Sequence, residues 1–571
     1  MQAALILAIA RAEMRSTRRL VRYWVFAVLS VLIASVMFFQ MAFMHGMFSR
    51  HSATVGAMGP RFLIAAVGTY LLIVFLIGLI FMAFDVRARD ERERMAEVLD
   101  SRPISNSEFL LGRCLGLVVM SWLPVLFVAA LLQIFGFLSL WNDWPIGEPL
   151  EPYSVMGFLL QTLTTLALWC SIIVFVAVGV RNRLAIAVIA LGLLGFQFWL
   201  TFQLQLYLQP VFTILPAFDM ASDLIPTLFP PGQGAGIHFL ALWMLTAGFV
   251  TLAIALHPRR DGGLTSRRLA LGGAFVVLSL ATIGVQWWQA NDALAQGAAV
   301  LAIHQEHSKA ARADIVAIDG TVRIDPGRAL DLDLDLRVRA HSGSPPVDQL
   351  VFTFNRGLSV QSVSVDGVAA PFTHASGLLK ISPSSPLTND AQVSLVASGV
   401  PDTTFGYLDT SFDLLKGDAV DAQLGVLGFD ISIFTSGYVA LMPGSRWLPR
   451  AGSDVPSGDP RTHPDDYFEV DLEVEAPADW LVAGPGRRQA VSAEGDTVRV
   501  RFNPSAPLSE VGLLASRFAR RSLQVAGVEF EVLVHPAHDR NLIFFADAGD
   551  ALEGRLEELL TEAERLGLPY P

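Results

Sequence analysis

Residues 87–113 read RARDERERMAEVLDSRPISNSEFLLGR and separate two long apolar stretches of the chain. The segment combines alternating charges, a Pro-Ile-Ser break at residues 103–105 and a short amphipathic restart at residues 108–113. A membrane span needs little beyond hydrophobicity, so a dense polar segment between two spans predicts contact with something outside the bilayer. The alternative is a positively charged anchor that only sets the orientation of the spans.

The composition around this segment is that of a membrane protein. Of 571 residues, 53% are hydrophobic and only 16% are charged, and the mean hydropathy is +0.48. An apolar helix needs about 20 residues to cross ~30 Å of hydrocarbon. Seven uncharged stretches meet this length, which predicts an α-helical membrane protein of about seven spans: residues 23–44, 62–84, 115–137, 155–180, 184–207, 237–256 and 269–288.

Basic residues predict the orientation of these spans. Five arginines precede the first stretch, six lie in residues 87–113, two in residues 181–183 and four in residues 257–268. The short loops on the other side hold only Arg50 and Arg61. Because Lys and Arg accumulate on the cytoplasmic side, we expect a multi-pass protein of the bacterial inner membrane with its N-terminus inside and its C-terminal half in the periplasm.

The five N-terminal arginines also predict a helix. Arg11, Arg15, Arg18, Arg19 and Arg22 follow one another mostly at three- and four-residue spacing, with Leu5, Ile6, Ile9 and Met14 between or before them. Such a pattern is typical of an amphipathic helix lying on the inner leaflet. Two roles stay open, an elbow that transmits motion into the bundle or an orientation anchor.

In residues 209–236, five prolines in an apolar loop predict short re-entrant helices.

The residues from Pro103 onward resemble a known family. Pro103-Ile104-Ser105, Glu108, Leu110-Leu111-Gly112 and Arg113 are similar to the P-(I/V)-S…E-x-L-L-G-K stretch of type-2 ABC exporter permeases. Glu97 falls where that family has the glutamate of G-T-x-E, although Arg94-Met95 replaces the Gly-Thr pair. The resemblance implies that residues 91–113 form a coupling helix that docks on an ATPase. Its candidate contact residues are Glu91, Glu97, Arg102, Pro103, Ser105, Glu108, Phe109, Leu110, Gly112 and Arg113.

The energy source must come from another chain under this hypothesis. No G-x-x-x-x-G-K-[ST] motif occurs, and none of the three lysines, Lys309, Lys380 and Lys416, follows a glycine-rich loop. We therefore expect no cofactor in this chain, ATP being used by a partner ABC ATPase, and pairing with a second copy or a homologous permease. Residues 289–571 carry 39 acidic and 22 basic groups, which argues against a nucleic-acid partner.

The acidic half predicts an antiparallel β domain outside the membrane. Apolar and polar residues alternate in eight short runs bounded by Gly, Pro, Ser and Asp. The predicted strands are residues 321–324, 330–338, 350–354, 359–365, 393–397, 468–474, 497–502 and 530–534. A polar helical stalk is expected before them at residues 289–313, and a helix after them from residue 548.

This half resembles the N-terminal β domain of aminopeptidase N-like gluzincins. The similarity rests on SRWLP at residues 445–449, on DDYFEVDLEVEAPADWLVAG at residues 465–484 and on LGLPYP at residues 566–571. The H-E-x-x-H motif of that family's zinc site is absent, so the resemblance implies zinc only where a catalytic domain is supplied elsewhere. His304 and His307 lack a third ligand nearby, so we predict no catalytic or metal site.

These observations divide the chain into six parts. They are a cytoplasmic elbow (1–22), a six-helix permease domain (23–256), a loop and seventh span (257–288), a stalk (289–313), an extracytoplasmic β domain (314–547) and the start of an apparently truncated helical segment (548–571). The hypothesis is an ABC permease subunit with a non-catalytic, aminopeptidase-like β domain. One alternative is a membrane-anchored zinc aminopeptidase whose catalytic half is missing from this chain, and another is a non-transporting scaffold that presents an outer peptide-binding domain.

Overall fold

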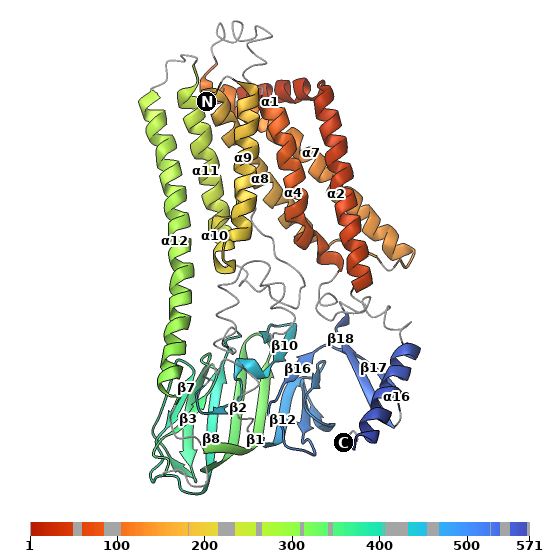
Figure 1. Cartoon of the computed structure of the whole chain (residues 1–571), viewed down its shortest axis with the longest axis vertical. Coiled ribbons are helices and arrows are strands. Elements are labelled where there is room, and N and C mark those ends of the chain that lie inside the picture. The colour runs from red at the N-terminus through yellow and green to blue at the C-terminus, as the bar shows by residue number, and fades with distance from the viewer. Residues whose placement is uncertain are drawn as a thin grey trace. The chain divides into compact units, whose positions relative to one another are not determined.

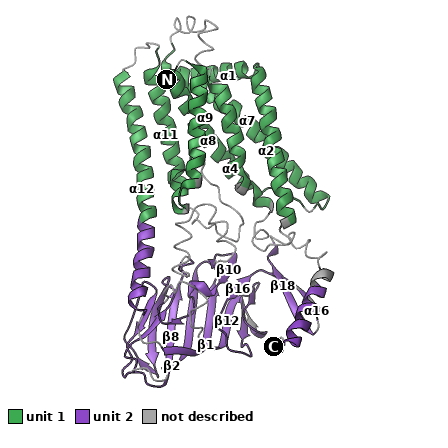
Figure 2. Cartoon of the chain, viewed as in Figure 1, with its two compact units in different colours: residues 1–291 green, residues 292–571 purple. Residues whose placement is uncertain are grey.

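A computed structural model describes most of the chain as two compact units, residues 1–291 and residues 292–571 (Figure 2). The first unit is helical and the second is built mainly of strands, as the sequence predicts. The described residues are 2–48, 60–84, 104–144, 146–180, 182–214, 235–258, 265–308, 313–340, 346–403, 405, 432–453, 467–525, 527–536 and 549–567.

Unit 1 is a bundle of long apolar helices (Figure 1). Its elements are α1 (Ala3–Arg18), α2 (Val21–Phe48), α4 (Leu63–Ala83), α7 (Asn106–Trp141), α8 (Pro152–Gly179), α9 (Arg183–Gln203), α10 (Gln209–Phe212), α11 (Ala235–Leu256) and the first part of α12 (Thr265–Glu306), which continues into unit 2 from residue 292. Among the described residues, α2, α7, α8, α9, α11 and α12 are long and apolar enough to cross a membrane, as expected for a membrane-spanning protein. In α4, which matches the remaining predicted span, the apolar stretch found is the shorter Tyr70–Ala83.

Two helices are longer than the sequence pattern predicts. The restart at residues 108–113 is no separate helix but the beginning of α7, which runs unbroken through Pro124 to Trp141. The predicted stalk is likewise continuous with the seventh span in α12. Residues 289–306 contain six alanines and no proline, so helical propensity continues past the apolar stretch.

Glycines set the close approach of α11 and α12. A β carbon on Gly248 would lie 2.7 Å from Cγ2 of Val276, and one on Gly272 would lie 2.9 Å from Cγ of Leu252. The hydroxyl of Ser279 donates a hydrogen bond of 2.8 Å to the carbonyl of Ala241, which satisfies a polar group inside the apolar bundle. Of the predicted re-entrant loop, α10 forms one helical turn, and residues 215–234 lie outside the described residues.

Unit 2 contains an eight-stranded sheet in the order β14-β15-β12-β1-β2-β8-β4-β5. Its strands are β1 (Ala313–Asp325), β2 (Ala329–Ala340), β4 (Leu358–Val365), β5 (Val368–Ala369), β8 (Asp390–Gly399), β12 (Glu469–Pro477), β14 (Arg488–Glu494) and β15 (Thr497–Phe502). The expectation of a purely antiparallel domain is wrong, because β1 pairs with β12 in parallel, from Ala317 opposite Glu469 to Arg323 opposite Glu475. The other pairs of this sheet are antiparallel, so the sheet is mixed.

Smaller sheets complete the unit. One has the order β13-β16-β10-β9, another β11-β3-β7-β6, and β17 pairs with β18 alone. Their bounds are β3 (Leu350–Thr353), β6 (Phe372–Ala375), β7 (Leu378–Ile381), β9 (Ile433–Phe434), β10 (Tyr438–Leu441), β11 (Arg450–Ala451), β13 (Leu481–Ala483), β16 (Leu513–Ser516), β17 (Ala519–Val525) and β18 (Val528–Val534). The predicted C-terminal helix is α16 (Gly549–Arg565).

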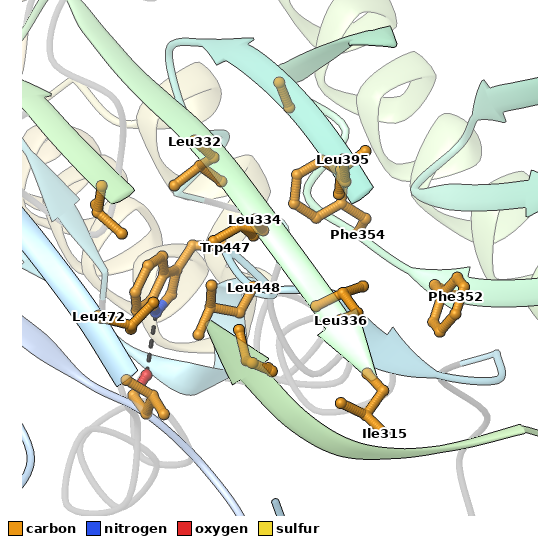
Figure 3. Close-up of a cluster of buried hydrophobic side chains, with 14 of the residues drawn as sticks. Ile315, Leu332, Leu334, Leu336, Phe352, Phe354, Leu395, Trp447, Leu448 and Leu472 are labelled. Carbon is orange, nitrogen blue, oxygen red and sulfur yellow. Dashed lines mark hydrogen bonds between the residues drawn. The ribbon is translucent and has the colours of Figure 1, made fainter. Parts of the chain in front are cut away.

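The alternating pattern of β2 explains the core of unit 2. In LDLDLDL, residues 330–336, every leucine is buried, whereas the aspartates lie on the opposite face of the strand. Figure 3 shows Leu332, Leu334 and Leu336 meeting side chains from β1, β3, β8 and β12. Trp447 fills the space beside them and donates its indole hydrogen to the carbonyl of Val511 at 3.0 Å.

Candidate functional site

The predicted coupling residues fall at the start of α7. Ser105, Glu108, Phe109, Leu110, Gly112 and Arg113 form its cap and first two turns, and Glu91, Glu97, Arg102 and Pro103 lie outside the described residues. In unit 1, α1 runs across this end of the bundle (Figure 1). The start of α7 and its cover, α1, are therefore the candidate site, and we refer to their contact as the clasp.

A capping box begins α7. The backbone N–H of Glu108 donates to Oγ of Ser105 at 3.2 Å, and the backbone N–H of Ser105 donates to Oε2 of Glu108 at 3.1 Å. This reciprocal pair satisfies two donors that a helix end otherwise leaves free. The other oxygen of Glu108 accepts from the backbone N–H of Gln2 at 2.7 Å. Glu108 thus joins the start of α1 to the start of α7.

Two glycines of α7 let α1 approach closely. A β carbon on Gly112 would lie 2.7 Å from Cβ of Ile9, and one on Gly116 would lie 2.9 Å from the carbonyl oxygen of Ala10. Side chains of ordinary size cannot fit at these distances, so the spacing of glycines four residues apart presents a flat surface to α1. The predicted N-terminal helix is present as α1 and packs one face against α7, and its position on the inner leaflet stays a prediction.

A buried ion pair closes the clasp. Nε of Arg113 lies 3.4 Å from Oε2 of Glu13, and 9% and 4% of the two side chains are exposed. The guanidinium carbon of Arg113 lies 4.6 Å from the centre of the Phe109 ring, which meets the ring of His257 edge to face at 5.9 Å. Charged, cation–π and aromatic contacts therefore link α1, α7 and the residue that follows α11.

Because α1 covers the start of α7, the predicted coupling residues there face the interior of their own chain. Phe109, Leu110 and Arg113 are all buried and are turned into their own chain. Phe109 and Leu110 therefore pack beneath the start of α7 against their own chain, and contact of this segment with an ATPase stays a prediction. Sequence reasoning missed Glu13, although a signal existed because Glu13 is the only acidic residue among the first 84.

His304 and His307 of unit 2 both form hydrogen bonds to backbone carbonyls. Nε2 of buried His304 donates to the carbonyl of Ser376 at 2.9 Å, and Nδ1 of His307 donates to the carbonyl of Ile303 at 2.9 Å. His304 thereby ties the end of α12 to the turn between β6 and β7. Within the part of the chain that the structure describes, no group of three or more His, Cys, Asp or Glu side chains could hold a metal ion.

The SRWLP stretch borders a pocket in unit 2. Arg446 and Trp447 line it together with Phe468 and Glu510. Arg446 has a left-handed backbone (φ +53°), and its buried side chain donates to the carbonyl of Pro443 at 3.1 Å. A non-glycine residue in this conformation is strained and must be held by its surroundings. Arg446 and Trp447 each donate a hydrogen bond to a backbone carbonyl. The SRWLP motif is therefore explained by its part in holding the fold around this pocket.

Comparisons with known proteins find similarity to solved structures of aminopeptidases. No protein-family model matches the sequence, and no curated protein matches it. The chain is similar to the M1 zinc metallopeptidase of Deinococcus radiodurans, with 17% identity and a TM-score of 0.30 over 39% of this chain and 47% of that one. It is also similar to Legionella pneumophila aminopeptidase A, with 12% identity and a TM-score of 0.30 over 41% and 25% of the two chains. The chain thus spans about half or less of the length of the M1 aminopeptidase structures that it resembles.

Proposed function

We propose that this chain is the permease subunit of a type-2 ABC exporter, driven by a separate ATPase. The observation that carries the proposal is the clasp. It fixes α1 to the first turns of α7, directly after the polar segment 87–103. A partner that moved this segment would move α7 and α1 together.

The close fit of α1 on α7 supports this role. Removing one partner of a buried ion pair costs about 3–5 kcal/mol, because the other charge is left buried without compensation. Glu13 and Arg113 must therefore stay paired, and together with the close contacts at Gly112 and Gly116 they fix how α1 lies on α7. An orientation anchor would need the positive charges alone and no such packing.

Partners and placement follow from the same proposal. The ATPase would contact the segment that includes Glu91, Glu97 and Arg102, and a second copy or a homologous permease would complete the translocation path. The chain would lie in a bacterial inner membrane with its N-terminus in the cytoplasm. Unit 2 would be periplasmic and would act as a non-catalytic binding or regulatory domain.

The test is a charge reversal in the proposed docking segment. Glu97→Arg should weaken association with a co-expressed ABC ATPase encoded beside this chain by 30-fold or more, because a buried interfacial charge is worth ~2–5 kcal/mol. Glu306→Arg, an exposed position at the end of α12, makes the same charge change in unit 2 and should leave association unchanged. The readouts are the amount of co-purified ATPase and the ATP hydrolysis that the permease stimulates.

Two results would count against the proposal. Wild-type ATPase yield and stimulated hydrolysis with Glu97→Arg would remove the coupling role. Zinc-dependent hydrolysis of aminoacyl substrates by the purified chain would instead favour a membrane-anchored aminopeptidase.

A further inference from the structure

The outer face of α1 is strongly basic. Arg11, Arg15, Arg18 and Arg19 are exposed, and the spacing of the first three residues places them on one side of the helix. Glu13, the one acidic residue of α1, points to the opposite side and is paired with Arg113. Among the residues that the structure describes, none of the four exposed arginines has an ion-pair partner. Within the described residues, the face therefore presents four positive charges with no carboxylate paired to them.

This basic face continues into an apolar surface of α2. Val21, Trp24, Val25 and Val28 are between 52% and 77% exposed at the beginning of that span. The indole N–H of Trp24 donates to the carbonyl of Arg18 at 2.9 Å, so the aromatic ring sits where the arginines end and the apolar surface begins. Tryptophan collects at the level of lipid headgroups, which places Arg18 and Arg19 at that level too.

We propose that the outer face of α1, defined by Arg11, Arg15, Arg18 and Arg19, is a binding site for the phosphate groups of anionic phospholipids. Guanidinium groups bind phosphate oxygens through paired hydrogen bonds. Leu7, four residues before Arg11 and 48% exposed, adds an apolar contact for the acyl region. Continuity with the lipid-facing side of α2 favours headgroups over a soluble protein as the occupant. This inference is independent of the proposed transport function.

The test compares two double variants of the full-length protein in phosphatidylcholine nanodiscs titrated with fluorescent phosphatidylglycerol. Near a membrane surface each arginine contributes a factor of about five to lipid affinity, so Arg11→Gln with Arg15→Gln should weaken binding about 30-fold. Arg183→Gln with Arg267→Gln removes the same charge from exposed positions at the first turns of α9 and α12 and should weaken binding far less, because these two arginines lie on separate helices and do not share one face. Excess inorganic phosphate should not displace the lipid, because it lacks the acyl chains.

Three outcomes would overturn the proposal. One is wild-type affinity in the α1 double variant, and another is an equal loss in both double variants. The third is unchanged lipid affinity together with loss of a co-purified ATPase, which would assign the face to a protein partner. Glutamine favours helices about as well as arginine, so an unchanged thermal transition should confirm that both variants fold.

Discussion

At the scale of single residues, Asp471 shows how unit 2 uses charge. Nε of Arg501 donates to Oδ1 of Asp471 at 2.6 Å, Nη2 of Arg501 donates to Oδ2, and the amide of Asn503 donates to Oδ2 at 3.1 Å. These hydrogen bonds from Arg501 lower the pKa of the Asp471 carboxyl below its ordinary value. They also connect β12 to β15 across the face of the sheet that carries the charged side chains.

We predict that Asp471→Asn destabilises this part of the sheet by about 1 kcal/mol at neutral pH, because a partly exposed charged hydrogen bond is worth that much. A lowered pKa in the folded state means that the ionised carboxylate stabilises the fold above its unfolded pKa of about 3.9. That contribution is lost as the pH falls through the lower, folded value.

Hydrogen exchange of the β12 and β15 amides in the full-length protein would measure this effect. Exchange in Asp471→Asn should be about five-fold faster than in the wild type at neutral pH, and the difference should close as the pH falls below about 4. Asp333→Asn, which alters an exposed aspartate on β2 of the same sheet, should match the wild type throughout. A difference that persists at the lowest pH would contradict the explanation.

At the scale of elements, the strands could be predicted from local sequence patterns, whereas the pairing of distant strands could not. All eight predicted strand segments fall on strands of unit 2, because alternation of apolar and polar residues reports one buried face. The parallel pair of β1 and β12 escaped prediction, since nothing in either strand specifies its distant neighbour. The small strands β9, β11 and β13 have only two or three residues each, too few to show a period.

The clasp was predictable only in part for the same reason. Ser105 and Glu108 were named from the sequence only as part of a docking motif, although S-x-x-E before an apolar run is also the local signal of a capping box. The partnership of Glu13 with Arg113 spans 100 positions and becomes visible only when α1 is laid on α7. The glycine pair of α7 could have suggested a close helix contact, yet not the identity of the helix.

Two glycine substitutions test the clasp. Gly112→Ala should destabilise the contact by about 1–3 kcal/mol, because its methyl group would meet Ile9 and the carbonyl of Ile6. Gly192→Ala in α9, where a β carbon meets no atom within 4 Å, should instead stabilise its helix by about 0.5–1 kcal/mol. Amide exchange along α1 should accelerate in the first variant only. Unchanged protection of α1 in Gly112→Ala would show that the helices do not depend on this contact.

At the scale of the whole molecule, the arginine bias predicts that the two units occupy different compartments. Ser266, at the start of α12, should face the cytoplasm, and Ser385, exposed between β7 and β8 in unit 2, should face the periplasm. Each serine can be replaced by cysteine in turn, because the native Cys114 and Cys170 are both buried and should react little. A membrane-impermeant maleimide should label Ser385→Cys and spare Ser266→Cys in spheroplasts. The reverse pattern would overturn the orientation.

The parallel pairing of β1 with β12 also has a consequence for how the protein is made. Ala317 and Glu469 are neighbours in the sheet but 152 positions apart in the chain. At synthesis rates of about 5–20 residues per second, roughly 8–30 seconds pass between the two leaving the ribosome. During that interval β1 can pair with β2 but keeps its other edge open, a site at which strands of nascent chains can join wrongly. Biogenesis of unit 2 therefore includes a vulnerable interval that ends only when β12 arrives.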